Sequence, residues 1–305
     1  MSPAGAAPLG VAFTGHWLRL DALLRLAARA EALGYALVLV DGDAGVAAPS
    51  ADRPVHDPTA VVAALARETK RVQLGAIHVA HFWNAALLAR SLATTQDLAA
   101  GRLVALFGVG AARETHRLGL PEPGAGERVA RLAETVAAVR ALLRGETVTA
   151  NGRFVALDRA RVTPPNRPVP IAISAAGPRA LEVVREHADV WDANVPPLRA
   201  RFEAARARLG RALPTWLWVF ARPGGARDDT VAAYRRHAPW FAELPPDEAA
   251  DAVLWGEPAR CRAELERLRG ELGLALPIAD LAGLDEAAAS RALEALAPAP
   301  AGRIP

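Results

Sequence analysis

Short apolar runs alternate along the chain with longer segments in which apolar residues recur every three or four positions. The runs have the length of buried strands, and the longer segments have the period of helices that bury one face. Strands are predicted at Leu9–Thr14, Leu37–Val40, Val72–Val79, Leu103–Phe107, Val169–Ile173, Val190–Asn194, Trp216–Ala221 and Ile278–Leu281. Helices are predicted at Leu20–Leu33, Pro58–Glu68, Ala85–Ala99, Val129–Leu143, Pro178–His187, Arg199–Leu209, Asp229–Trp240, Ala259–Leu272 and Glu286–Leu296.

A strand followed by a helix, repeated eight times with short links, is the pattern of a (β/α)8 TIM barrel, an α/β fold. The chain has 305 residues, 52% of them hydrophobic, which is enough to bury a core of that size. Neither an internal repeat nor a low-complexity linker divides it, so we predict one domain over residues 1–305. At about residues 145–168, two alternating runs flank Asn151-Gly152 and predict a β-hairpin inserted between the fourth helix and the fifth strand.

Composition limits the classes of binding partner and the cellular compartment that we expect. The net charge is +3, but every basic residue except Lys70 is an arginine, dispersed among acidic residues on helical faces. Because no basic cluster with interleaved aromatic residues is present, nucleic acid is not an expected partner. The single cysteine, Cys261, cannot form an internal disulfide and has no metal-ligand spacing around it, so no metal is expected. With no signal-peptide pattern and no apolar run of membrane-spanning length, we expect a cytoplasmic protein without a membrane partner.

In a barrel of this kind the active site lies at the C-terminal ends of the strands. Small residues surround the ends of the fourth and fifth strands, and histidines and aromatic residues follow the third. A small-residue floor with an aromatic rim suits a large planar cofactor. The candidates at the strand ends are Thr14, His16, Trp17, Asp41, Asp43, His78, His81, Phe82, Trp83, Gly108, Gly110, Arg113, Glu114, Ser174, Ala175, Ala176, Gly177, Asp192, Asn194 and Arg222.

The junction Ser174-Ala175-Ala176-Gly177-Pro178 permits two interpretations. One is a tight strand-to-helix turn, for which glycine gives backbone freedom and proline a good first helical residue. The other is an anion bound on the junction, because a helix start with free N–H groups and no bulky side chains is a phosphate site. The residues alone leave both open.

Four segments carry a resemblance to a known family: "AEALGYALVLVD", "TKRVQLGAIHVAHFWNAALLARSLATTQDLAAGRLVALFGVG", "GERVARLAETVAAVRALLRGE" with its "NGRF" hairpin, and "PIAISAAGPRALEVVREHADVWD". With "GEPARCRAELERL" they cover most of residues 9 to 283. In this order and spacing they resemble the bacterial luciferase-like group of flavin-dependent barrel oxidoreductases.

The resemblance implies a cofactor phosphate held by the backbone at Ser174, Ala175, Ala176 and Gly177 and by the guanidinium of Arg128, whose planar fork suits phosphate oxygens. Gly108 then belongs to the cofactor floor. The third strand supports the cofactor ring, and many members of the family carry a cis peptide there, which would join Ile77 to His78 or fall one residue earlier. His78 either points into the pocket or is a buried histidine of the barrel wall.

The chain also departs from some members of the family. The histidine that often follows the second strand is replaced by Asp41-Gly42-Asp43, so we predict no imidazole from that position near the cofactor. Ala111 stands where the deazaflavin-dependent sugar dehydrogenases have a glutamate, and the chain is about two residues shorter between Gly75 and Asn84. These departures weigh against that subgroup and leave the choice between FMN and the deazaflavin coenzyme F420 open.

The resemblance implies a monooxygenase that uses reduced FMN, supplied by a flavin reductase, and dioxygen on a small organic substrate. His16, His78 and His81 are the candidates for proton handling because imidazole titrates near neutrality, and Asp43 is a further one. Trp17 and Trp83 are candidates for the substrate wall. Two alternatives remain: hydride transfer with F420, and a non-catalytic flavin-binding barrel. Helices 58–68 and 85–99 carry more alanine and leucine than one barrel face needs, which predicts a homodimer through them.

Overall fold

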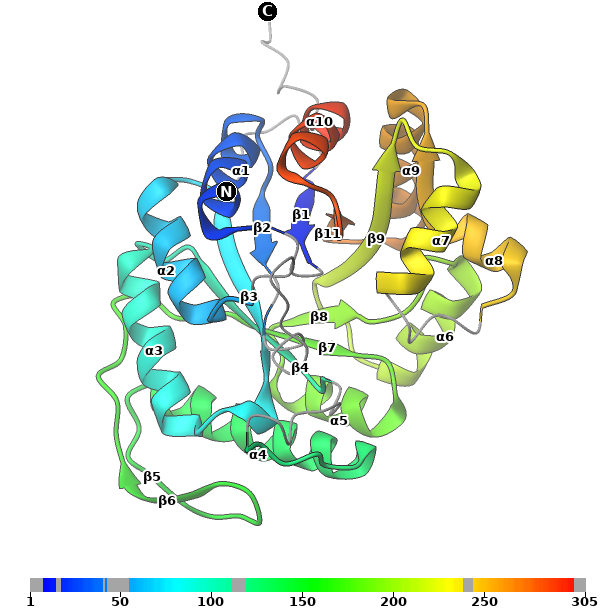
Figure 1. Ribbon diagram of the computed structural model, residues 1–305. Coiled ribbons are helices and arrows are strands. Elements are labelled where there is room, and N and C mark those ends of the chain that lie inside the picture. Colours follow the sequence, from blue (N-terminus) through cyan, green and yellow to red (C-terminus); the bar gives the residue numbers. More distant parts are fainter. Residues whose placement is uncertain are drawn as a thin grey trace, which may run out of the picture.

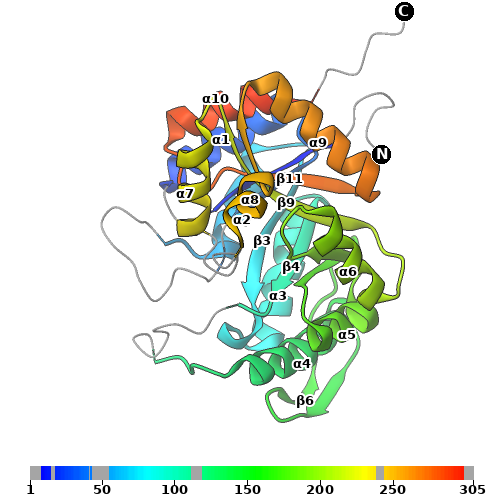
Figure 2. The same ribbon diagram turned by 90° about the vertical axis from the view of Figure 1, so that its right-hand side faces the viewer.

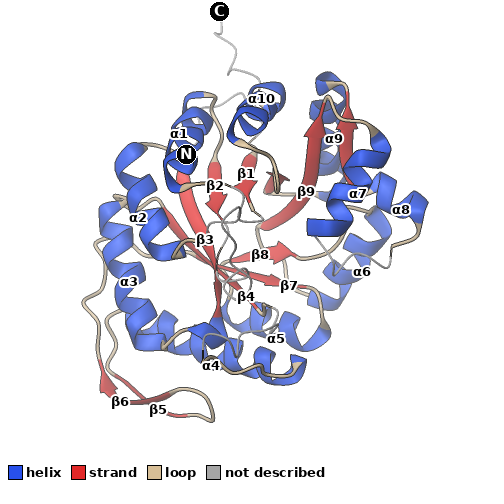
Figure 3. Cartoon of the chain, viewed as in Figure 1, coloured by secondary structure: helices blue, strands red, loops and turns tan. Residues whose placement is uncertain are grey.

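The computed structural model of the chain describes residues 8–14, 18–40, 42, 55–110, 119–237 and 244–298. A ring of parallel strands occupies its centre, and helices surround the ring on the outside (Figures 1 and 3). The chain alternates between strand and helix because each short apolar run is buried on both faces, whereas each helix buries one stripe against the strands.

The barrel strands agree with the predicted ones to within two residues. Strand β9 pairs with both β8 and β11, and β1 pairs with both β11 and β2, which closes the ring and confirms the TIM barrel. The strands are β1 (Gly10–Phe13), β2 (Leu37–Val40), β3 (Gln73–Val79), β4 (Leu103–Gly108), β7 (Ile171–Ala175), β8 (Val190–Ala193), β9 (Thr215–Pro223) and β11 (Leu276–Asp280).

The helices begin where the sequence offers caps. Asp57 accepts a hydrogen bond from the backbone N–H of Ala60, and Asn84 and Asp285 cap two other helices in the same way. The helices that follow the barrel strands are α1 (Leu20–Ala32), α2 (Pro58–Glu68), α3 (Ala85–Leu98), α4 (Ala125–Leu143), α5 (Pro178–His187), α6 (Arg199–Leu209), α7 (Arg227–His237), α9 (Pro258–Leu272) and α10 (Glu286–Leu296).

Three elements were not predicted. Helix α8 (Pro246–Asp251) leads into a short strand, β10 (Val253–Gly256), which pairs in parallel with the last residues of β9. Both α7 and α8 contact β10. Figure 2 shows these two helices at the side of the barrel. A single 3₁₀ turn, η2 (Ala80–Phe82), follows β3 and packs on α4.

The predicted hairpin is confirmed as the antiparallel pair β5 (Val148–Asn151) and β6 (Ala156–Ala160), which projects away from the barrel (Figure 1). The carboxylate of Glu134 on α4 accepts hydrogen bonds from three consecutive backbone N–H groups, those of Arg153, Phe154 and Val155. The hairpin is therefore attached to a helix of the outer layer.

The core has two layers, separated by the barrel wall. One layer fills the barrel and is formed by Ala12, Leu37, Leu39, Val104, Leu106, Ala172, Trp216, Leu276 and Ile278, with Ile77, Val190 and Trp218 packed against them. The larger layer lies between strands and helices. Because side chains alternate along a strand, residues two positions beyond the inner layer face the mouth of the barrel at its C-terminal end.

Candidate functional site

The floor of the mouth is formed by Gly108, Ser174 and Asp192. They lie in one row across β4, β7 and β8, because Gly108 pairs with Ser174 and Ser174 with Asp192. Neighbouring strands lie about 4.8 Å apart, so the three residues are adjacent. Among the described residues, a Cβ added to Gly108 would have two heavy atoms within 4 Å, the nearer being Cγ2 of Ile77 at 3.4 Å, and Gly108 itself is buried. No described side chain therefore fills the position next to Gly108 on the barrel interior.

Ile77 borders this floor, and its carbonyl oxygen lies against the backbone of Gly42, which follows β2. A Cβ placed on Gly42 would lie 1.7 Å from the carbonyl oxygen of Ile77, so the backbone after β2 presses directly on β3. Every peptide bond in the described part of the chain is trans, including the one between Ile77 and His78. The cis peptide that the family resemblance implied at this position is thus absent.

The N-terminal end of α5 is open. Its N-cap, Gly177, is exposed, no side chain caps the helix, and a Cβ added to Gly177 would meet no atom within 4 Å. Ser174 and Ala176 are partly exposed beside it. The junction is therefore a tight turn that also leaves the first N–H groups of α5 available to an anion, so the two interpretations of this sequence are compatible.

Two arginines lie near the helix starts. Arg128, in the first turn of α4, donates from Nη1 to the carbonyl oxygen of Pro123 at 2.9 Å, while its buried Nε has no hydrogen-bond partner. The Nη1 atom of Arg179, in the first turn of α5, lies 3.4 Å from the position of a Cβ on Gly126. Sequence reasoning missed Arg179, although it follows Gly177 by two residues, because one arginine among so many carries little signal.

His78 lies in the outer core layer. Its ring is 5.9 Å from that of Trp83 and 6.0 Å from that of Phe107, between centroids, and the residue is 1% exposed. Burial lowers the pKa of His78 to about 4, opposed in part by the nearby carbonyl groups of Leu106 and Ala76, although neither ring nitrogen makes a hydrogen bond of normal geometry. The contacts of His78 therefore support its interpretation as a neutral, buried histidine of the barrel wall. The structure does not place its side chain in the mouth.

Trp83 packs against the same outer layer and is partly buried. Its ring contact with His78 gives it a packing role in the apolar layer, and a role in a substrate wall stays a prediction.

His81, in η2, lies beside the start of α4. It is 7% exposed, and its ring centroid is 4.3 Å from that of Phe82 in an edge-to-face arrangement. Burial, together with the positive charges of Arg128 and Arg131, lowers the pKa of His81 to about 4, opposed by Glu127. The imidazole is therefore neutral at physiological pH, and the structure brings it towards Arg128.

On the opposite side of the mouth, residues at the C-terminal ends of β1, β9 and β11 contact one another. Thr14 donates to Asp280 Oδ1 at 2.7 Å, and the guanidinium of Arg222 donates to the carbonyl oxygens of Ala221 and Ala282 and stacks on Phe220. Asp280 was not predicted. Several predicted candidates lie outside the described residues, namely His16, Trp17, Asp41, Asp43, Arg113 and Glu114.

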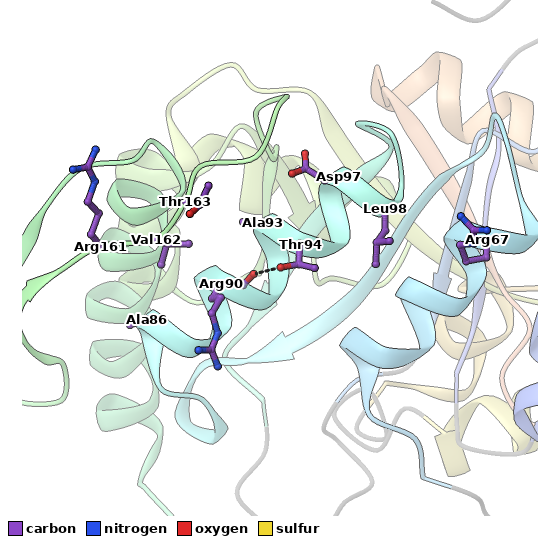
Figure 4. A pocket seen from close by; sticks show the side chains of 10 residues that line it. All are labelled: Arg67, Ala86, Arg90, Ala93, Thr94, Asp97, Leu98, Arg161, Val162 and Thr163. Atoms are coloured by element: carbon purple, nitrogen blue, oxygen red, sulfur yellow. Dashed lines mark hydrogen bonds between the residues drawn. The ribbon is translucent and has the colours of Figure 1, made fainter.

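A separate groove of about 770 Å³ runs along the outer face of α3 (Figure 4). It extends from Arg67 at the end of α2 to residues 161–163 after the hairpin, and Arg90, Thr94 and Leu98 of α3 line it. This groove lies on the helical surface, away from the floor described above.

Comparison with protein families matches residues 5–213 to the family described as luciferase-like monooxygenase. The chain belongs to this family. Within the described residues, none of the helices of this luciferase-like protein has the length and apolarity needed to cross a bilayer.

The luciferase-like chain is 36% identical over 130 residues to the F420-dependent glucose-6-phosphate dehydrogenase of Beutenbergia cavernae. That match covers 41% of the chain and 39% of the relative, so the chain spans about two fifths of the length of this curated relative.

Two solved structures share the fold. An F420-dependent secondary alcohol dehydrogenase superposes with a TM-score of 0.77 at 19% identity, covering 95% of the chain and 99% of that structure. The EDTA monooxygenase of Chelativorans sp. BNC1 superposes with a TM-score of 0.76 at 14% identity, covering 96% and 92%. The luciferase-like barrel thus occurs both in a protein described as an F420-dependent dehydrogenase and in one described as a monooxygenase.

Proposed function

We propose that the protein is a flavin-dependent oxidoreductase, a monooxygenase that binds reduced FMN at the barrel mouth and uses dioxygen on a small organic substrate. The observation that carries the proposal is the combination of a floor of small residues at Gly108 and Ser174 with a cationic, uncapped edge formed by α5 and Arg128. A flat ring fits the floor, and a phosphate fits the cationic edge.

The residues present fit such a cofactor. The buried Nε of Arg128 has an unused donor, and a phosphate oxygen is the acceptor that a guanidinium fork matches. When bound, the cofactor would supply the redox chemistry. The chain's own residues would hold it: the N–H groups at Gly177 and the start of α5 bind the phosphate, Ile77 supports the ring from one side, and the apolar layer below the floor excludes water.

Hydride transfer with coenzyme F420 is the second candidate. The relative from Beutenbergia cavernae is described as F420-dependent, and Arg179 places a second guanidinium close to the start of α4, where a longer anionic cofactor would extend. A cytoplasmic location and delivery of reduced flavin by a reductase complete the proposal.

Replacing Arg128 with alanine should weaken FMN binding at least tenfold and leave the fold intact, because the guanidinium is assigned to the phosphate and makes one hydrogen bond with the described residues. Fluorescence titrations with FMN and with F420, each on wild type and variant, measure the effect. Arg144→Ala, at an exposed arginine, is the matched control.

Equal affinity of the Arg128→Ala variant and the wild type for both cofactors would remove Arg128 from the phosphate site. Tighter binding of F420 than of FMN would favour the second candidate. Binding of FMN without dioxygen consumption by the reduced complex, tested over a panel of small organic compounds, would favour a non-catalytic flavin-binding protein.

We also propose a homodimer that forms through α2 and α3. Leu87 and Leu98 are 52% and 46% exposed, and with Thr94 they lie on one face of α3, because residues seven and eleven positions apart share a helix face. This face adjoins the groove of Figure 4. Large exposed leucines beside a groove are typical of an interface between protein chains.

Replacing both Leu87 and Leu98 with glutamate should convert the dimer to a monomer, because burying two carboxylates in an apolar interface is unfavourable. Light scattering at micromolar protein concentration measures the mass. Leu20→Glu, at an exposed leucine of α1, is the control and should leave the dimer unchanged. A monomeric wild type would contradict the proposal directly.

A further inference from the structure

Asp192 is a buried carboxyl group at the floor of the mouth. It lies on β8, opposite Ser174 of β7 and Trp216 of β9, and is 3% exposed. Val190, two residues earlier on the same strand, packs in the inner layer, so the side chain of Asp192 faces the interior of the barrel, in the same row as Ser174 and Gly108.

The polar groups around Asp192 leave it incompletely satisfied. Its buried Oδ1 has no hydrogen-bond partner, and neither does the buried Nε1 of Trp218, two residues beyond Trp216 on β9. The Ser174 hydroxyl and the Trp218 indole are the groups that act on the carboxyl, and they stabilise its charged form only in part. Among the described residues, no arginine, lysine or histidine contributes to its titration.

A buried carboxylate without a cationic partner is unfavourable, so such a group binds a proton instead. Burial raises the pKa of Asp192 to about 7. At neutral pH the group is therefore divided between its two forms. The neutral acid is a hydrogen-bond donor, whereas the carboxylate only accepts and repels an anion. The charge of a ligand on the floor thus decides which form is favoured.

We propose that Asp192 is a positioning residue that takes up a proton when an electron-rich, anionic planar ring binds on the floor, and that the resulting carboxylic acid donates a hydrogen bond to that ring. The inference rests on the proposed function, because reduced FMN and reduced F420 are the rings of that class. Ser174 and Trp218, on the two neighbouring strands, lie beside the carboxyl, and Gly108 lies one strand beyond Ser174.

The proton site is tested first without any cofactor. Infrared difference spectra of the wild type, recorded from pH 5 to pH 9, should contain the band of a protonated carboxyl group that titrates near neutrality. This band should be absent from Asp192→Asn, which keeps the size of the side chain, and present in the control Asp158→Asn, an exposed aspartate of the hairpin. The absence of any carboxyl titrating above pH 5.5 in the wild type would overturn the inference, even if the variant did not fold.

The link to the ligand is tested by anaerobic calorimetric titration with reduced FMN, and separately with reduced F420, at pH 8 in two buffers of different ionisation enthalpy. The wild type and Asp158→Asn should take up about one proton more per bound ring than Asp192→Asn, because the ionised group must regain its proton. The ratio of wild-type to Asp192→Asn affinity should fall about eightfold between pH 7.5 and pH 8.5. Titration of the ring itself is common to both proteins and cancels in this ratio.

Equal proton uptake by the wild type and Asp192→Asn would overturn the role of Asp192 towards the ring. If neither ring binds to the wild type, the proposed function fails together with that role, but the infrared titration still decides whether Asp192 is a proton site. The two failures are therefore distinguishable.

Discussion

Replacing Gly108 with valine is expected to reduce the affinity for FMN at least a hundredfold, a loss of about 2.8 kcal/mol in binding free energy. The branched side chain would project from the floor into the barrel mouth, where Cγ2 of Ile77 is the nearest atom of the described residues to the added Cβ. That space is the one assigned to the cofactor ring. The fold should tolerate the change, because β4 is a buried strand and valine favours strand conformation.

The effect of Gly108→Val is measured by FMN titration alongside the thermal midpoint of unfolding, which should remain within about 3 °C of wild type, a shift of roughly 1 kcal/mol. Ala156→Val, on the exposed hairpin strand β6, introduces the same residue far from the mouth and should change neither quantity. Normal FMN affinity in the Gly108 variant would move the ring away from this floor.

Replacing Arg102 with methionine should lower the free energy of unfolding by about 3 kcal/mol, because buried polar groups lose their partners. The guanidinium donates four hydrogen bonds at 2.9 to 3.1 Å, to the hydroxyl and carbonyl oxygens of Thr69 and to the carbonyl oxygens of Ala66 and Val72. Carbonyl groups at a helix C-terminus lack partners within the helix, and a cation is favoured there. Methionine keeps the apolar stem and removes every donor.

Denaturant unfolding measures the difference, and the thermal midpoint should fall by at least about 5 °C, since each kcal/mol corresponds to roughly 2 to 4 °C in a domain of this size class. Arg144→Met is the matched control, because the side chain of Arg144 is 58% exposed and forms a surface ion pair with Glu146. It should shift stability by less than about 0.5 kcal/mol. A loss of the same small size in both variants would show that Arg102 does not hold the end of α2.

The strands were predictable because a short apolar run such as Leu37–Val40 permits little else between two helical patterns. Strand β10 was missed because four residues, Val253–Gly256, are too few to stand out beside helical sequence. Helix α4 begins at Ala125, four residues before the predicted Val129. The prediction placed the start too late because Gly124 and Gly126 have the composition of a loop.

The orientation of His78 was beyond the sequence for a physical reason. Residues 74–79 are buried on both faces of β3, apart from Ile77, which is partly buried, so the pattern contains no exposed side from which the lumen-facing residues can be read. The structure assigns Ile77 to the inner layer and His78 to the outer one. Sequence identified the floor at Gly108 and Ser174, whereas Arg179 and Asp280 required the contacts between distant elements.

Several polar contacts that hold the strands together lie at the end of the barrel opposite the floor. Just before β3, Glu31 accepts hydrogen bonds from the backbone N–H groups of Lys70, Arg71 and Val72, and just before β4 Gln96 accepts from Leu103 and donates to Pro168. A laboratory selection for a new substrate would act on residues around the floor, whose replacement should affect folding little. The contacts of Glu31 and Gln96 at the other end of the barrel would keep the protein stable enough to accept such changes.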